Sequence, residues 1–125
     1  MIFDTDVLIW ALKGNKRAAE AIDAAKERHI SVINYMELIC GARDKAELRA
    51  VRSFLKDMGF SILPLTENLG LRASVYLEEY FLATGLSLAD ALLAATAVAH
   101  QLAFLTGNAR HFKRISELTL KTFRP

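Results

Sequence analysis

The first ten residues of the chain, MIFDTDVLIW at positions 1–10, decide the fold. Residues 1–3 form a short apolar run typical of a buried strand, and Asp4 and Asp6 stand where that strand would end. A helix is expected next, over residues 7–13. A carboxylate beside large apolar side chains is costly unless a cation or a hydrogen-bond donor meets it. The opening stretch therefore predicts a strand–helix unit with acids at the carboxyl end of its strand.

The rest of the chain repeats this alternation of strand and helix. Further strands are expected at residues 29–33, 60–65, 103–106 and 118–123. Further helices are expected at residues 16–28, 34–41, 44–59, 67–84, 87–100 and, for one turn, 108–112. Pro64 lies at the end of its strand, which favours an edge position for that strand. The pattern predicts one α/β domain over residues 1–125, with three α/β/α layers around a central, mostly parallel sheet of about five strands.

Composition narrows the class of protein. With 125 residues, 53% of them hydrophobic, and only two prolines, the chain is expected to fold as one compact domain. The formal charge is +2 and arginines outnumber lysines nine to seven, which is compatible with a phosphate-bearing partner. The single cysteine excludes an internal disulfide, and acids near the amino terminus argue against a secretory signal. The apolar run at 91–99 is far shorter than the ~20 residues that span a bilayer, so we expect a soluble, cytoplasmic protein with no membrane partner.

Four acidic residues have large apolar neighbours in the sequence, and the predicted topology brings them toward one edge of the sheet. Asp4 and Asp6 follow the first strand, and Asn108 follows the fourth. Glu37 and Asp90 lie in the first turns of predicted helices. Sites in parallel sheets form at the carboxyl ends of strands, near the point where the strand order reverses. These residues therefore predict one shared site, and its natural occupant is a hard divalent cation.

Each acid also has a purely structural explanation. Asp6 could cap the first helix, and the segments 34–37 and 87–90 both have the spacing of a capping box, in which the last residue reaches back to the first. Asp4 caps nothing obvious in the predicted helix limits. One metal site explains all four acids together, whereas the capping explanation needs four separate helix caps that are all flanked by large apolar residues.

Four segments, in order and at consistent spacing, resemble the PIN-domain ribonucleases, and most of all the VapC-type toxins of bacterial and archaeal toxin–antitoxin pairs. They are IFDTDVLI at 2–9, SVINYMELICG at 31–41, LSLADALLAATA at 86–97 and LTGNARHF at 105–112. The resemblance covers nearly the whole chain. It implies a PIN-like fold and a metal-dependent endoribonuclease that hydrolyses phosphodiester bonds in RNA.

The resemblance also assigns roles to individual residues. Asp4, Glu37 and Asp90 match the three core acids with which the family holds Mg²⁺ or Mn²⁺. Thr5 and Asp6 match the Thr and the small polar residue that usually follow the first acid. The expected partners, besides RNA, are a small antitoxin protein that inserts near the acidic site and a second copy of the chain in a homodimer.

The chain departs from the family pattern at one place. The family often has a fourth acid at the position of Asn108 or three residues later, at His111. Asn108 could supply a carbonyl oxygen and Asp6 part of the missing charge, but a second metal ion is put in doubt. Candidates for phosphate contacts, from their positions alone, are Arg43, Arg110 and Lys113.

Two other functions remain open from the sequence. The opening FDTDVL also fits a haloacid-dehalogenase-type phosphohydrolase, with Asp4 as nucleophile and Asp6 as general acid. No acidic pair follows a later strand, and the chain is short for that fold. The other alternative is a non-catalytic binding module that keeps the PIN fold without the chemistry, which the missing fourth acid makes conceivable.

Overall fold

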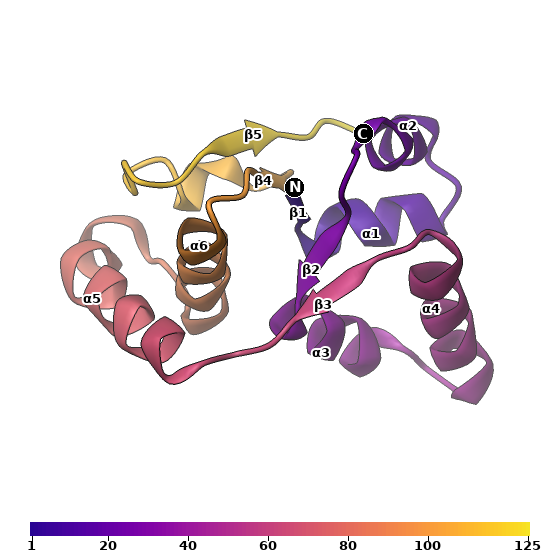
Figure 1. The fold of residues 1–125 in the computed structure, drawn as a ribbon, viewed down its shortest axis with the longest axis horizontal. Helices are drawn as coiled ribbons and strands as arrows, with labels where there is room; N and C mark the ends of the chain where they lie inside the picture. Colours follow the sequence, from indigo (N-terminus) through magenta and orange to yellow (C-terminus); the bar gives the residue numbers. More distant parts are fainter.

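The computed structural model describes all of residues 1–125, and its centre is a five-stranded sheet in the order β3-β2-β1-β4-β5. Every neighbouring pair of strands is parallel, which confirms the predicted sheet (Figure 1). The strands are β1 (Ile2–Phe3), β2 (His29–Ser31), β3 (Ser61–Leu63), β4 (Phe104–Thr106) and β5 (Leu120–Thr122). The chain runs outward from β1 through β2 to β3 and then returns to the other side of β1 with β4. The strand order therefore reverses between β1 and β4, which is where ligand sites form in such sheets.

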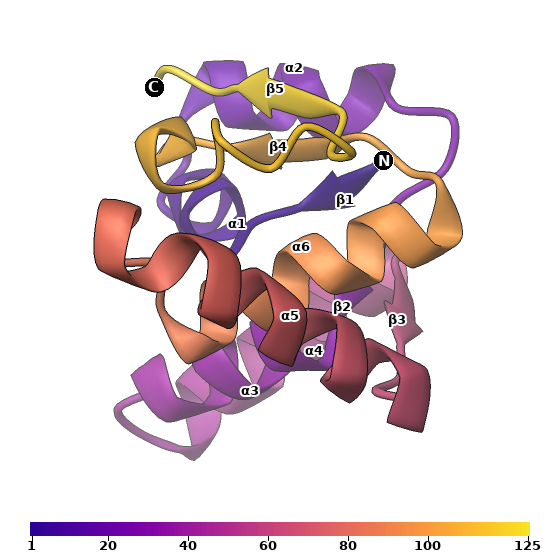
Figure 2. The same cartoon turned by 90° about the vertical axis from the view of Figure 1, so that its left-hand side faces the viewer.

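Helices cover both faces of the sheet and complete the three layers. They are α1 (Thr5–Leu12), α2 (Lys16–Ala24), α3 (Val32–Gly41), α4 (Lys45–Asp57), α5 (Glu67–Thr84), α6 (Leu88–His100) and the short 3-10 helix η1 (Ala109–His111). Helices α5 and α6 pack on one face, on the left in Figure 1 and in front in Figure 2. Helices α1 to α4 lie on the opposite side. None of the helices combines the length and the apolar character that a membrane span requires.

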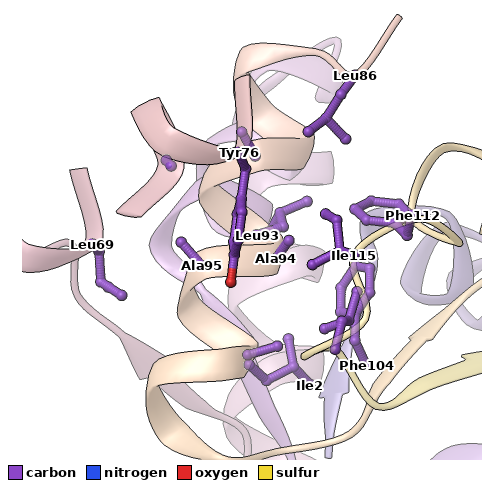
Figure 3. Packing of buried hydrophobic residues seen from close by; sticks show 14 residues of the cluster. Ile2, Leu69, Tyr76, Leu86, Leu93, Ala94, Ala95, Phe104, Phe112 and Ile115 are labelled. Atoms are coloured by element: carbon purple, nitrogen blue, oxygen red, sulfur yellow. The ribbon is translucent and has the colours of Figure 1, made fainter. Parts of the chain in front are cut away.

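Alternating strand residues divide the core into two parts. Ile2 packs with α5 and α6, whereas the next residue, Phe3, packs with α1, α2 and α4. Phe104 and Leu105 on β4 divide in the same way, because successive side chains of a strand point to opposite faces. Figure 3 shows the first part, in which the rings of Phe104 and Phe112 meet edge-on at 5.0 Å between centroids. Full burial of each such side chain contributes about 2 kcal/mol to folding.

Two helices begin earlier than the sequence predicted, because a different residue caps each of them. Asp4 is the N-cap of α1, and its Oδ1 accepts a 2.8 Å hydrogen bond from the Thr5 amide. The expectation that Asp6 caps this helix is therefore wrong. Ser31 is the N-cap of α3, and Asn34 completes a capping box with it. The capping box predicted for residues 34–37 is also wrong, and Glu37 caps nothing.

Other boundaries follow the predictions more closely. Helix α5 covers the predicted residues 67–84, and Gly85 ends it with a φ of +71°, in the left-handed region that glycine favours. Strand β3 lies at the edge of the sheet, as Pro64 indicated. Helix α2 ends at Ala24, before the predicted residue 28, and Arg28 instead donates hydrogen bonds to the carbonyls of Ile22 and Met58 near the ends of α2 and α4.

Candidate metal site

Asp4 is the centre of the candidate site, at the carboxyl end of β1 and the amino terminus of α1. Its Oδ2 accepts a 2.7 Å hydrogen bond from the hydroxyl of Thr106, the last residue of β4. Its Oδ1 accepts from the Thr5 amide at 2.8 Å and from Asn34 Nδ2 at 3.5 Å. The carboxylate is thus held at the point where the strand order reverses, by donors from three separate segments.

The environment of Asp4 makes its negative charge unfavourable. Burial raises the pKa of Asp4 to about 6, and the nearby carboxylates of Asp6 and Glu37 push it in the same direction. The hydrogen bonds from Thr106 and Thr5 act against this rise, because they stabilise the ionised form. A cation at this place would remove both the repulsion and part of the cost of burial.

Asp6 faces the loop that follows β4. Its Oδ2 accepts a 2.9 Å hydrogen bond from the Gly107 amide, whereas its Oδ1 is buried without any hydrogen-bond partner. Gly107 leaves room for this carboxylate: a Cβ at residue 107 would lie 2.5 Å from Asp6 Oδ2, so the carboxylate would have to turn away. Burial raises the pKa of Asp6 as well. A buried carboxylate oxygen without a partner is energetically costly. A cation, or a water bound to it, would provide the missing partner.

Glu37 lies on α3 and reaches the site through Thr5. The Thr5 hydroxyl donates a 2.7 Å hydrogen bond to Glu37 Oε1, across 32 positions of the sequence. Glu37 is exposed, and so are its apolar neighbours Met36 and Ile39, so the apolar residues around it in the sequence did not indicate burial. Its carboxylate is accessible to solvent and to a ligand.

Asp90 enters from the opposite helical layer, in the first turn of α6. Its amide donates to the Ser87 hydroxyl at 3.0 Å, but its carboxylate makes no reciprocal bond to the Ser87 amide, so the capping box at 87–90 is only half formed. The carboxylate oxygen Oδ2 instead lies 4.0 Å from Nδ1 of His111. The side chain of Asp90 is about four-fifths buried and that of His111 about three-quarters buried. That His111 nitrogen is buried and has no hydrogen-bond partner.

The structure brings the predicted residues together to different degrees. No hydrogen bond joins two of the acids directly. Thr5 links Asp4 with Glu37, and the neighbouring residues Thr106 and Gly107 donate to Asp4 and Asp6. The exposed Asn108 is next to this group, because its backbone amide donates to the Thr106 hydroxyl at 3.0 Å. The Asp90 carboxylate lies 4.0 Å from His111 and makes no hydrogen bond to this group. In the present side-chain positions, no three His, Cys, Asp or Glu side chains are gathered closely enough to hold one ion. An all-oxygen donor set still suits Mg²⁺, which keeps several waters and is often held by carboxylates through them.

Comparison with known proteins assigns the fold to a family. Residues 1–118 match the PIN domain family. The chain belongs to the PIN-domain family. It is 34% identical over 122 residues to Ribonuclease VapC10 of Mycobacterium tuberculosis, an alignment that covers 94% of this chain and 90% of the relative.

Solved structures agree with this assignment. A chain of a toxin–antitoxin complex from Klebsiella pneumoniae superimposes with a TM-score of 0.82 at 30% identity, over 97% of this chain and 95% of that one. VapBC2 from Rickettsia felis, bound to a DNA fragment from its promoter, gives a TM-score of 0.80 over 99% of this chain and 100% of that one. Its identity of 20% supports the shared fold alone.

Membership of the PIN-domain family settles several predictions from the sequence. The resemblance to VapC-type proteins is confirmed, and the haloacid-dehalogenase interpretation of Asp4 and Asp6 is wrong. PIN-domain ribonucleases generally depend on a divalent metal. Of the acids that match the family pattern, Asp4 lies at the switch point of the sheet, Glu37 is linked to it through Thr5, and Asp90 lies beside His111; the unpartnered Oδ1 of Asp6 is a further oxygen donor. The donor set therefore fits such an ion chemically.

Sequence reasoning missed three residues of the PIN-domain site. Thr106 and Asn34 are fully buried polar residues that hold Asp4, and Gly107 leaves room for Asp6. A polar residue at the end of an otherwise apolar strand, as in the sequence Phe-Leu-Thr at 104–106, was the available signal for Thr106. Of the predicted phosphate contacts, Arg43 is already paired with Glu47 at 2.9 Å, whereas Arg110 and Lys113 are exposed.

Proposed function

We propose that this PIN-domain protein is a metal-dependent endoribonuclease that hydrolyses phosphodiester bonds in RNA, and that it is the toxin of a toxin–antitoxin pair in the cytoplasm. The observation that carries the proposal is Asp4, a partly buried carboxylate with a raised pKa at the switch point of the sheet, with two further acids close to it. The 34% identity with a VapC ribonuclease supports the same reaction.

In this proposal Asp4, Glu37 and Asp90 hold Mg²⁺ or Mn²⁺ directly or through water, with Asp6 and Asn108 in support. When bound, the ion polarises a phosphodiester and makes a water more acidic. The hydrogen bond from the Thr106 hydroxyl favours the ionised form of Asp4, and the bond from the Gly107 amide holds one oxygen of the Asp6 carboxylate. The repulsion between the uncompensated carboxylates is relieved on binding, so binding also stabilises the fold.

The charge of the site supports one ion better than two. Asn108 and His111, where relatives often carry a fourth acid, are neutral or cationic side chains. Asn108 offers at most a carbonyl oxygen, and the buried His111 nitrogen faces Asp90. We therefore propose a single divalent cation, with Asp6 supplying part of the charge that the fourth acid would give.

A groove beside the acids supports the antitoxin as a partner. It runs between α1, α3 and α4, and its apolar walls include the exposed Ile9 and Leu12. Glu37 is one of its lining residues, so a peptide in the groove would also reach this acid. The Klebsiella pneumoniae relative at 30% identity was solved as a toxin–antitoxin complex. We propose that an antitoxin segment with apolar residues and a basic side chain occupies this groove.

A second apolar surface supports the homodimer. Helix α5 exposes a set of large apolar side chains: Leu71, Val75, Phe81 and Leu82. Leu82 is 96% exposed and cannot contribute to the core of its own chain. A second copy that brings the same helix to this surface would cover both sets at once, as a two-fold interface requires.

RNA cleavage by purified, antitoxin-free protein tests the nuclease. The assay is run with Mg²⁺, with Mn²⁺ and with chelator, beside the variant Asp90→Asn. The capping hydrogen bond at the start of α6 comes from the backbone amide of Asp90. Asp90→Asn therefore preserves this bond and removes only the charge of the side chain. We expect metal-dependent cleavage that disappears in the folded variant. Equal cleavage by both proteins would remove Asp90 from the site, and no cleavage of varied RNAs would favour a non-catalytic binding module.

A further inference from the structure

Asn34 is the polar residue of α3 that is fully removed from solvent, with an exposed fraction of 0%. Its Oδ1 accepts a 2.9 Å hydrogen bond from the Ser31 amide, and its Nδ2 donates to Thr5 Oγ1 at 3.1 Å. The orientation of the amide is fixed, because a backbone N–H can only donate and must therefore face the carbonyl oxygen. The side chain thus links the end of β2 to the start of α1.

The direction of these hydrogen bonds determines where the Thr5 hydroxyl points. A hydroxyl has one proton, and Thr5 Oγ1 already accepts from Asn34. Its proton is therefore free for Glu37 Oε1, which lies 2.7 Å away and, when ionised, can only accept. The result is a relay of three bonds in one direction, from the Ser31 amide through Asn34 and Thr5 to the carboxylate of Glu37.

We propose that Asn34 is a positioning residue of the metal site: it aims the Thr5 hydroxyl at Glu37 and so holds that carboxylate beside Asp4 before a cation arrives. Glu37 is exposed, and without such a bond its long side chain would sample many rotamers. The weak 3.5 Å contact from Asn34 to Asp4 Oδ1 adds a link to the second acid. The inference rests on the proposed metal-dependent function and concerns how the buried Asn34, acting through Thr5, holds the proposed metal ligand Glu37.

A simpler role for Asn34 is that of a helix cap alone, since its Oδ1 completes the capping box of α3. The two roles differ at Thr5. A cap alone predicts that Asn34 affects stability and that Thr5 is independent of it. The relay predicts that removing Asn34 and removing the Thr5 hydroxyl have the same effect on cation binding, because each breaks the same path.

The test is a double-mutant cycle on Mn²⁺ affinity, measured by titration calorimetry on protein shown to be folded by circular dichroism. The variants are Asn34→Leu, Thr5→Val and the two combined, with Thr5→Ser as the conservative variant that keeps the hydroxyl. The control is Asn15→Ala, since Asn15 Oδ1 also caps a helix, by accepting from the Ala18 amide at 3.0 Å, but lies outside the relay.

We expect Asn34→Leu and Thr5→Val each to weaken Mn²⁺ binding by about 10- to 100-fold, as changes around a metal ligand do. The combined variant should be no weaker than either single one, Thr5→Ser should bind like the wild type, and Asn15→Ala should lose only thermal stability. Wild-type affinity in Asn34→Leu, or losses that multiply in the combined variant, would overturn the relay and leave the nuclease intact.

Two further outcomes are equally decisive. If Asn34→Leu does not fold, Thr5→Val decides: weakened binding that Thr5→Ser restores supports the relay, and unchanged binding overturns it. If the wild type itself binds no Mn²⁺, the proposed metal-dependent function fails and the inference fails with it.

Discussion

Thr106 Oγ1 donates a 2.7 Å hydrogen bond to Oδ2 of Asp4, and the two residues are 102 positions apart in the sequence. The same oxygen accepts from the Asn108 amide at 3.0 Å, so its single proton is directed to the carboxylate. This bond joins the ends of β1 and β4, which are the two strands on either side of the switch point. It is also one of the few favourable interactions that the ionised form of Asp4 has.

Removing the Thr106 hydroxyl should therefore make Asp4 harder to ionise. We expect Thr106→Val to raise the pKa of Asp4 by about one unit above its value in the wild type, since hydrogen bonds to charged groups are worth ~1.5–3 kcal/mol. Carbon-13 NMR of the aspartate carboxyl groups would measure this as a function of pH. Thr106→Ser keeps the hydroxyl and should titrate like the wild type; an unchanged pKa in Thr106→Val would show that the bond does not stabilise the ionised form.

The raised pKa of Asp4 predicts how the metal-free protein responds to pH. In the folded chain the pKa is about 6, above the unfolded value of 3.8, so the folded state binds the proton more tightly. The stabilising contribution is complete below pH 3.8 and is lost as the pH rises through about 6. Its size is about 3 kcal/mol. Denaturant unfolding from pH 4 to 7.5 should show this decline, and in Asp4→Asn the decline should be smaller, with the part that remains coming from Asp6, whose pKa is also raised.

Addition of a divalent cation should reverse that trend. A cation binds the ionised carboxylates of the folded chain and therefore stabilises it most at high pH, where protons no longer compete. We expect 5 mM Mn²⁺ to raise the melting temperature at pH 7.5 and to have little effect at pH 4.5. An equal rise at both pH values would mean that Mn²⁺ binds away from Asp4.

Gly107 makes room for the Asp6 carboxylate, and a methyl group there should displace it. In Gly107→Ala the new Cβ would lie 2.5 Å from Asp6 Oδ2, so the flexible carboxylate must turn away and lose the bond from the residue 107 amide. We expect a stability loss of about 1 kcal/mol and a clear loss of RNA cleavage. Gly41→Ala is the matched control, because no atom lies within 4 Å of its added Cβ. Full cleavage by Gly107→Ala would show that Asp6 is not needed.

The exposed apolar surface of α5 predicts the effect of a charge on the proposed homodimer. Leu82 is 96% exposed, so Leu82→Glu should leave the fold of the single chain unchanged. At a two-fold interface, however, it would place like charges near one another in an apolar contact. Sedimentation should therefore show a dimer for the wild type and a monomer for Leu82→Glu. A dimeric variant would locate the interface elsewhere.

Much of the fold could be predicted because local signals agree with the global arrangement. Helix α5 was located at its true limits, since Thr66 and Gly85 mark its two ends and no competing residues stand beside them. At α1 and α3, two candidate caps are close together in the sequence, and the later one was chosen each time. The cap is the residue at which the preceding strand ends. The position of that strand end depends on how the strand pairs in the sheet.

The candidate site was predictable in its acids and not in the groups that hold them. Asp4 and Asp6 lie at the carboxyl end of β1, as the topology predicted, and Glu37 is linked to this place through Thr5, although these acids are not gathered closely enough to hold one ion as they stand. The contacts from Thr5 to Glu37 and from Thr106 to Asp4 depend on rotamers and on hydroxyl directions, which no sequence pattern contains. Asp90 was expected at the same centre, and its contact with His111 depends on the packing of η1 against α6.

The absent fourth acid leads to a prediction for Asn108. This exposed residue follows the end of β4. Its backbone amide donates to the Thr106 hydroxyl, which itself donates to Asp4, so Asn108→Asp would add a carboxylate at the edge of the site. In the metal-free protein the added charge repels Asp4 and should lower stability by about 1 kcal/mol or less, because the site is open to solvent there. With cation present the sign reverses, and we expect tighter Mn²⁺ binding and faster RNA cleavage.

Asn68→Asp, an exposed change on α5, controls for the added charge alone. Calorimetry would measure affinity and stoichiometry together: a second bound Mn²⁺ in Asn108→Asp would show that the fourth acid sets the number of ions, whereas unchanged affinity and stoichiometry would mean that Asn108 lies outside the metal site.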